Sequence, residues 1–198
     1  QLTIHIDPEG STNGISSKSY LEWPDYYINA QEISLEKNTI IYNSGKSTSL
    51  KERFNPNAIA LSDLTFASNS LEYEPENIQL ELEKFSFVEK SGFRLRNLAF
   101  NANLNNTSAS LSGLKLQTNS SFVNGEVELR FPDVQQLIDS PENTTVDLQI
   151  PDLELAIQDA FYFEPELANN EPLQTAAQQP FSGNLTAKGT LNSFKIND

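Results

Sequence analysis

The sequence contains no cysteine and no methionine, and it has one histidine and one tryptophan among 198 residues. Without cysteine there is no disulfide, no thiol nucleophile and no thiolate-bound metal or iron–sulfur cluster. The single histidine, His5, offers too few ligands for a zinc site and no partnered base for a nucleophilic triad. No phosphate-cradling glycine motif is present either. We therefore expect a protein that is not an enzyme and that holds no metal and no cofactor.

Basic residues are also scarce. Lysine and arginine number 13 against 27 aspartates and glutamates, a net charge of −14. Such a chain lacks the cationic face that nucleic acids and anionic lipid headgroups require. There is no apolar run of about 18 residues, so we expect no transmembrane segment in this piece. Because the sequence begins at Gln1, we expect one β-rich segment, residues 1–198, cut from a longer protein, with a weak join near Asn55.

What the chain does have is alternation of polar and apolar residues. It is clearest in residues 78–83, 93–96, 98–104, 126–131 and 146–150. A period of two predicts strands with one apolar and one polar face, which is typical of antiparallel sheets. Turn-forming residues separate the runs about every dozen positions, at Lys90-Ser91-Gly92, Asn105-Asn106-Thr107 and Asn119-Ser120-Ser121. The pattern predicts a mainly-β antiparallel meander.

In several places the alternation slips by one residue. A slip turns every later side chain to the other face unless a β-bulge absorbs it. We predict bulges at Lys84 and Asn97, where no turn residue is present, while Gly113 and Pro151 fit either a bulge or a turn. Long strands bent at bulges would give an amphipathic curved sheet, a groove or an incompletely closed barrel.

Helix is expected to be rare, with at most one or two short helices. Pro132 and Asp133 are suited to the start of one of them. Residues 159–163 fit a helical turn or a tight corner. The glutamine- and alanine-rich residues 169–180 are predicted to form a loop, as are the glycine- and asparagine-rich residues 7–18.

Three groups of side chains merit a functional interpretation beside a structural one. The carboxylates alternate with apolar residues, so we predict that they line a solvated sheet face rather than a catalytic site; they are Glu72, Glu74, Glu76, Glu81, Glu83 and Glu89. A second group of oxygen ligands suits either a bound cation or a plain loop and comprises Asp7, Glu9, Ser11 and Asn13. The third group is aromatic and suits either a binding platform or core packing: Trp23, Tyr26, Tyr27 and Tyr42.

Four stretches of the chain carry a resemblance to a known family. They are Phe54-Asn55-Pro56-Asn57-Ala58-Ile59, Phe87-Val88-Glu89-Lys90-Ser91-Gly92-Phe93, Leu116-Gln117-Thr118-Asn119-Ser120, and the strand–Asp–Phe-x-Pro pattern within residues 155–167. Over about residues 25–196 the chain resembles the AsmA/TamB-like envelope proteins of Bacteroidetes-type bacteria.

The resemblance implies a periplasmic location in a Gram-negative bacterium, in a protein that an N-terminal helix anchors in the inner membrane. It implies a non-enzymatic, apolar-lined β-groove, U-shaped in section, that serves phospholipid transport or outer-membrane biogenesis with an outer-membrane β-barrel partner. Because members of this family are far longer, this chain would be one segment of such a protein.

If the segment forms such a groove, alternating apolar side chains would line it. The candidates are Leu80, Leu82, Phe93, Leu95, Phe100, Leu104, Leu114, Leu116, Val127 and Leu129. The same residues would equally fill the closed core of a structural β-module that binds a protein or glycan partner. Alternation is identical in the two cases, so the sequence leaves both open.

Overall fold

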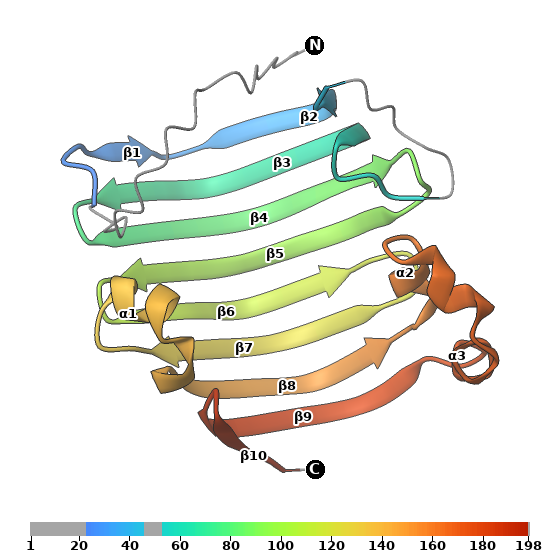
Figure 1. Cartoon of the computed structure of the whole chain (residues 1–198). Coiled ribbons are helices and arrows are strands. Elements are labelled where there is room, and N and C mark those ends of the chain that lie inside the picture. The colour runs from blue at the N-terminus through green and yellow to red at the C-terminus, as the bar shows by residue number, and fades with distance from the viewer. Residues whose placement is uncertain (1–22, 46–52, 198) are drawn as a thin grey trace.

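The structure, a computed structural model, describes residues 23–45 and 53–197, which form one ten-stranded antiparallel sheet (Figure 1). The strands are β1 (Ile28–Ala30), β2 (Ile33–Asn43), β3 (Ala58–Glu74), β4 (Asn77–Glu89), β5 (Arg94–Asn105), β6 (Ser108–Gln117), β7 (Phe122–Arg130), β8 (Thr145–Leu155), β9 (Phe181–Thr190) and β10 (Ser193–Asn197). The predicted mainly-β class is confirmed.

The order of the strands is that of a meander. From β3 to β10, each strand pairs with the next one in the sequence. β1 and β2 share the other side of β3, where β1 pairs with Leu71–Tyr73 and β2 pairs along residues 58–68. The β1/β2 edge and the β10 edge lie at opposite sides of the sheet, so the sheet is not closed into a barrel (Figure 1).

The three predicted hairpins are present, and their polar residues hold the turns. Between β5 and β6, the Asn105 side-chain oxygen accepts hydrogen bonds from the backbone N–H groups of Thr107 and Ser108, both at 2.9 Å. Between β6 and β7, the N–H of Ser121 donates to the Thr118 hydroxyl at 2.9 Å. These side-chain contacts satisfy turn donors that have no ladder partner.

Bulges run across the middle of the sheet. Glu83 and Lys84 of β4 together face Ala99 of β5, and Arg96 and Asn97 of β5 together face Ser86 of β4. Both predicted bulges are therefore confirmed. The open cases are decided the same way, because β6 continues through Gly113 and β8 continues through Pro151. At each bulge one strand stays regular, so the alternating apolar residues before and after the bulge remain on the same face.

The helices lie at the two ends of the strands (Figure 1). At one end, α1 (Val134–Asp139) begins as predicted, with the Asp133 carboxylate accepting from the N–H of Gln136 at 2.7 Å, and η1 (Pro141–Asn143) follows. At the other end are α2 (Gln158–Phe161), η2 (Pro165–Asn169) and α3 (Glu171–Ala176).

The third helix corrects two expectations, that of at most two short helices and that of a loop over residues 169–180. Asn170 caps α3 by accepting from the N–H of Leu173 at 3.2 Å, and Pro172 lies in the first turn. Both residues are standard helix-start signals. The glutamine- and alanine-rich composition around them concealed these signals.

Candidate functional site

The ten predicted lining residues all lie on one face of the sheet, here called the apolar face. Cross-strand partners in a sheet project to the same side. Leu82 pairs with Phe100, Leu116 with Val123, and Leu111 with Val127. At each bulge the opposite strand has no extra residue, so its alternation shows that the residues before and after the bulge lie on the same face. Phe93 belongs to the same face because its ring lies 6.3 Å from that of Phe87.

These residues differ in exposure. Leu82 and Leu95 are buried, with 5% and 7% of their surface exposed, while the other eight are only half-buried. Among residues 23–45 and 53–197 there is no second sheet that could pack on this face. A sheet with one apolar face normally buries it against another layer. The structure therefore presents a broad apolar surface that these residues leave partly uncovered.

The face is larger than the ten predicted residues. It also includes Phe66 and Phe85, which pair with each other across β3 and β4, and Leu148, which pairs with Val127 across β7 and β8. On β9, Ala187 pairs with Leu148 and extends the face further. These residues also follow the alternating pattern in the sequence. Alternation alone did not show that they belong to the same face as the ten predicted residues.

Phenylalanine rings form a continuous row over one part of this face. Consecutive ring centroids are 6.2 Å apart for Phe66 and Phe85, 5.4 Å for Phe85 and Phe87, and 6.3 Å for Phe87 and Phe93. The row continues from Phe93 to Phe163 at 4.9 Å and ends at Phe54, 5.3 Å further on. Residues from four separate parts of the chain thus share one aromatic cluster.

The segment that carries Phe163 closes one end of the apolar face, and we call residues 157–170 the end wall. It leaves β8 and passes the β6–β7 turn, where the Asn119 side chain donates to the Tyr162 hydroxyl at 3.4 Å. It then covers Phe93 and reaches the residues before β3, where the N–H of Phe54 donates to the carbonyl of Tyr162 at 2.9 Å. The end wall thus spans the strand ends from β8 to β3.

Buried polar groups anchor the end wall. Asp159 accepts a hydrogen bond from the Thr118 hydroxyl, and the Ser121 hydroxyl accepts from the N–H of Ala156 at 3.0 Å. The second carboxylate oxygen of Asp159 is buried without a hydrogen-bond partner. Residues 54–59, 87–93, 116–120 and 155–167 all contribute to this end of the sheet.

Glu89 lies at the same end and corrects a prediction. We expected its side chain on the solvated face, but only 3% of the residue is exposed. Its two carboxylate oxygens accept from the N–H of Ala60 at 3.3 Å and from the N–H of Ser91 at 2.6 Å. The carboxylate closes the turn between β4 and β5 and links it to β3. The other five carboxylates of the predicted group are exposed, as expected.

The opposite strand ends carry tyrosine and tryptophan. Trp23 and Tyr26 pack on Tyr73, with ring centroids 6.4 Å and 4.9 Å away, and the Tyr73 hydroxyl donates to the carbonyl of Pro24 at 2.7 Å. Burial, with Tyr26 and Asp25 nearby, raises the pKa of Tyr73. We call these residues the tyrosine cluster.

The other two members of the predicted aromatic group do not join this cluster as packed rings. Tyr27 is 74% exposed. Tyr42 pairs with Ile59 at the far end of β3, 14 residues from Tyr73 and therefore about 45 Å away along the strand. The sequence grouped the four by proximity along the chain, which a long strand does not preserve.

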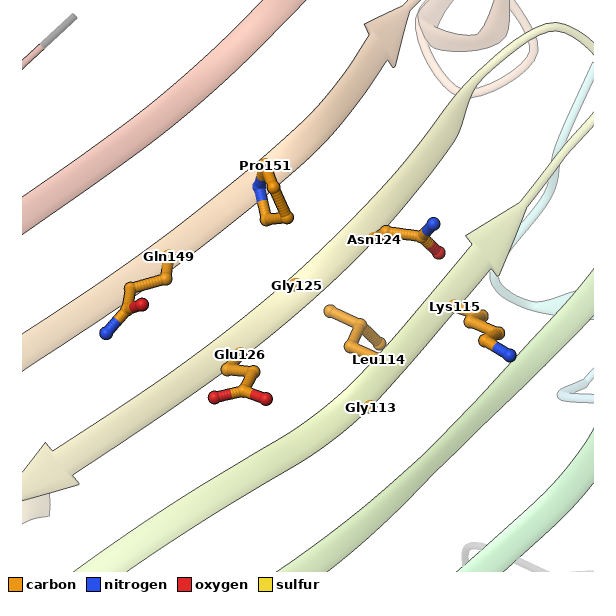
Figure 2. A pocket seen from close by; sticks show the side chains of 8 residues that line it. All are labelled: Gly113, Leu114, Lys115, Asn124, Gly125, Glu126, Gln149 and Pro151. Atoms are coloured by element: carbon orange, nitrogen blue, oxygen red, sulfur yellow. The ribbon is translucent and has the colours of Figure 1, made fainter.

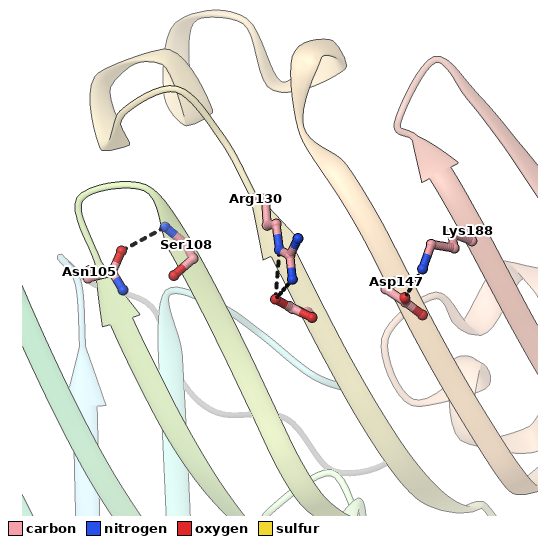
Figure 3. Close-up of polar contacts among 6 residues, drawn as sticks. Asn105, Ser108, Arg130, Asp147 and Lys188 are labelled. Atoms are coloured by element: carbon pink, nitrogen blue, oxygen red, sulfur yellow. Dashed lines mark hydrogen bonds and ion pairs between the residues drawn. The ribbon is translucent and has the colours of Figure 1, made fainter.

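The polar face of the sheet carries ion pairs and a shallow depression. Arg130 pairs with Glu128, and Lys188 pairs with Asp147, each at 2.7 Å. Figure 3 shows the Lys188–Asp147 pair across β8 and β9. The hydrogen bond from Lys188 lowers the pKa of Asp147. Figure 2 shows the depression, about 350 Å³, where Gly113 and Gly125 leave room beside Lys115, Glu126 and Gln149. Its polar groups do not converge on one point.

Other candidate sites can be placed only in part. His5 and the group Asp7 to Asn13 lie outside the described residues. Within the described ranges, no three acidic or histidine side chains gather in a way that could hold a metal ion. In the same ranges, no helix has the length and apolar character needed to cross a membrane.

Comparison with protein-family models, with curated proteins and with solved structures finds no match to this chain.

Proposed function

We propose that the apolar face binds the acyl chains of phospholipid, and that the chain is a non-enzymatic, β-groove segment of an AsmA/TamB-like envelope protein. The observation that supports this proposal is the unclosed, single-layer sheet with half-buried leucine, valine and phenylalanine side chains across it. Acyl chains suit such a surface, because their burial gains free energy in proportion to area and needs no directional contact.

The wider setting belongs to the same proposal and follows from the family resemblance. It comprises a periplasmic location, an inner-membrane anchor elsewhere in the parent protein, and an outer-membrane β-barrel partner. A lipid groove would also account for the division of the sheet, with ion pairs such as Lys188–Asp147 on one face and aliphatic residues on the other.

The alternative function is a structural module with a closed core that presents its sheet edges or its aromatic group to a protein or glycan partner. The described sheet is not closed, so its apolar residues do not fill a barrel. The β2 edge is interrupted by register shifts around Lys37 and Asn38, and Lys37 has a positive φ of 50°. Bulges and lysine on an edge strand hinder the addition of another strand. This edge therefore favours the lipid proposal.

The test measures lipid bound to the purified chain. The protein is prepared from a bacterial envelope fraction without detergent, and its organic extract is analysed by mass spectrometry. We expect phospholipid in the wild-type extract and at least a tenfold loss in Leu116→Asp and Val127→Asp, because about 1.4 kcal/mol of lost apolar contact already lowers affinity tenfold. Leu82 and Leu95 are unsuitable, since their burial makes a charge there unfold the sheet.

Gln117→Asp is the matched control. Gln117 adjoins Leu116 on β6 but is exposed on the polar face, so this variant should keep wild-type lipid. Circular dichroism and thermal unfolding check that each variant is folded. A lipid-free wild-type protein would contradict the proposal, and so would folded Leu116→Asp and Val127→Asp variants that retain wild-type lipid.

A further inference from the structure

The polar face has a second hollow beside the β6–β7 turn, at the strand ends that the end wall covers on the apolar side. Its volume of about 530 Å³ lies within the range of small-molecule sites, about 300–1,000 Å³. Residues from four neighbouring parts of the sheet line it, namely Arg96 of β5, Ser120 of the turn, Phe122 of β7 and Glu154 of β8. This hollow is a candidate site separate from the apolar face.

Two arginines without partners border the hollow. Arg94 and Arg96 flank the buried Leu95, so both side chains project from the polar face, about 6.6 Å apart along β5. Arg96 lines both this hollow and a smaller one that it shares with Arg94. Neither guanidinium has an ion-pair or hydrogen-bond partner among residues 23–45 and 53–197, although the chain has 27 acidic residues. Guanidinium groups held in this way suit a carboxylate or a phosphate.

Two carboxylates at the hollows restrict the charge of a ligand. Asp63 lines the smaller hollow and Glu154 lines the larger one, and neither forms an ion pair with the two arginines. They repel a second anionic group, but Glu154 can accept hydrogen bonds from hydroxyl groups. A ligand with one anionic group and several hydroxyl groups therefore satisfies both kinds of charge.

An aromatic ring completes the larger hollow. Phe122 pairs with Glu154 across β7 and β8, whereas the next residue, Val123, pairs with Leu116 and Leu153 on the apolar face. Phe122 thus belongs to the polar face, where it is half-buried and part of its surface stays accessible. The C–H face of a sugar ring packs on such a ring while the sugar hydroxyls reach the polar groups around it.

The turn that carries Ser120 is held by buried hydrogen bonds. The N–H of Thr118 donates to the carbonyl of Ser121 at 2.9 Å, and the Thr118 hydroxyl donates to Asp159. The Ser121 hydroxyl accepts from the N–H of Ala156 at 3.0 Å, which joins the turn to the end of β8. A site whose backbone is fixed in this way loses little conformational entropy when a ligand binds.

We propose that this hollow binds a sugar with one anionic group, a carboxylate or a phosphate, with the sugar ring on Phe122 and the anionic group at Arg96 and Arg94. The site lies on the face opposite the proposed lipid surface, and the inference does not rest on lipid binding. An acidic peptide fits less well, because it brings no hydroxyl-rich ring and the net charge of −14 repels it.

The test follows the amide NMR spectrum of the isotope-labelled chain during titration with sugars. The acidic probes are glucuronosyl-N-acetylglucosamine, which carries a carboxylate, and N-acetylglucosamine phosphate, and the neutral probe is N-acetyllactosamine. We expect the amide signals of Ser120 and Phe122 to shift with at least one acidic probe, which should bind about tenfold more tightly than the neutral probe. The acidic probe with the higher affinity identifies the anionic group.

Substitutions separate the parts of the site. Arg96→Gln and Phe122→Ala should each lower the affinity about tenfold, whereas Phe122→Trp keeps an aromatic surface and should retain it. Arg130→Gln is the matched control, because Arg130 also lies on the polar face but is paired with Glu128. In all four variants the lipid content of the purified chain should equal that of the wild type.

Three results would overturn the proposal. They are the absence of shifts with both acidic probes, equal affinity for the acidic and neutral probes, and an Arg96→Gln variant that binds like the wild type. Triglutamate or inorganic phosphate that bound as tightly as the acidic sugars would also overturn it, because the hollow would then select an acidic peptide or a bare anion.

Discussion

Replacing Gly125 with alanine is expected to destabilise the sheet by about 3 kcal/mol or more. A Cβ at this position would lie 2.3 Å from the carbonyl oxygen of Gln149 and 2.5 Å from the Cδ1 of Ile150. The oxygen belongs to the β8 backbone, which is held at this point by the bulge at Pro151. Relief therefore requires β7 and β8 to separate, with loss of ladder hydrogen bonds. Urea unfolding followed by circular dichroism measures the effect.

Gly183→Ala is the matched control for this prediction. It makes the same chemical change on β9, but the nearest atoms to its Cβ would be those of the Phe181 ring at 3.8 Å. We expect a change below about 1 kcal/mol. Gly113→Ala should fall between the two, because its φ of +61° disfavours alanine while nothing crowds it. Equal stability of the Gly125 and Gly183 variants would contradict the close approach of β7 and β8.

Glu89→Ala is the second large effect, with an expected loss of about 3 kcal/mol. The substitution removes the acceptor for two backbone N–H groups, those of Ala60 and Ser91, in a place that water does not reach. Hydrogen bonds to a charged group contribute about 1.5–3 kcal/mol each, and an unsatisfied buried donor costs a similar amount. Thermal or urea unfolding measures the loss.

Two further variants test whether stability depends on both carboxylate oxygens of Glu89 or would fall with the loss of any glutamate on this strand. Glu89→Gln should be nearly as destabilising, because its amide NH₂ would face one of the two donors instead of accepting from it. Glu83→Ala, on the same strand but exposed, should change the stability by less than about 0.5 kcal/mol. If Glu89→Gln were as stable as the wild type, the carboxylate would not be closing the turn through both oxygens.

Much of the sheet was predictable because its signals are local. Alternation identified the strands, and the slips at Lys84 and Asn97 located bulges that the structure contains. Gly113 and Pro151 remained open because a turn and a bulge use similar residues and differ only in whether the strand continues. Asn170 and Pro172 did signal the start of α3, but a six-residue helix leaves no apolar period to support such a signal.

The residues of the candidate site could be predicted from the sequence, but whether they line an open face or a closed core could not. Alternation places Leu80, Leu116 and Val127 on one face whether the sheet is open or closed, so only the observed strand order decides between the two. Neither the end wall nor the buried position of Glu89 has a local signal. Both depend on contacts between distant parts of the chain, such as that of Phe54 with Tyr162.

The meander also has a consequence for how the chain folds. Since every strand from β3 onward pairs with its neighbour in the sequence, most contacts close short loops at little entropic cost, and hairpins can be added one after another. A sheet built this way would open gradually from an edge. The end wall opposes this, because it ties the residues before β3 to those after β8. Strands β3 to β8 should therefore unfold as one cooperative unit, while the β9–β10 hairpin, which lies outside that tie, should fray first.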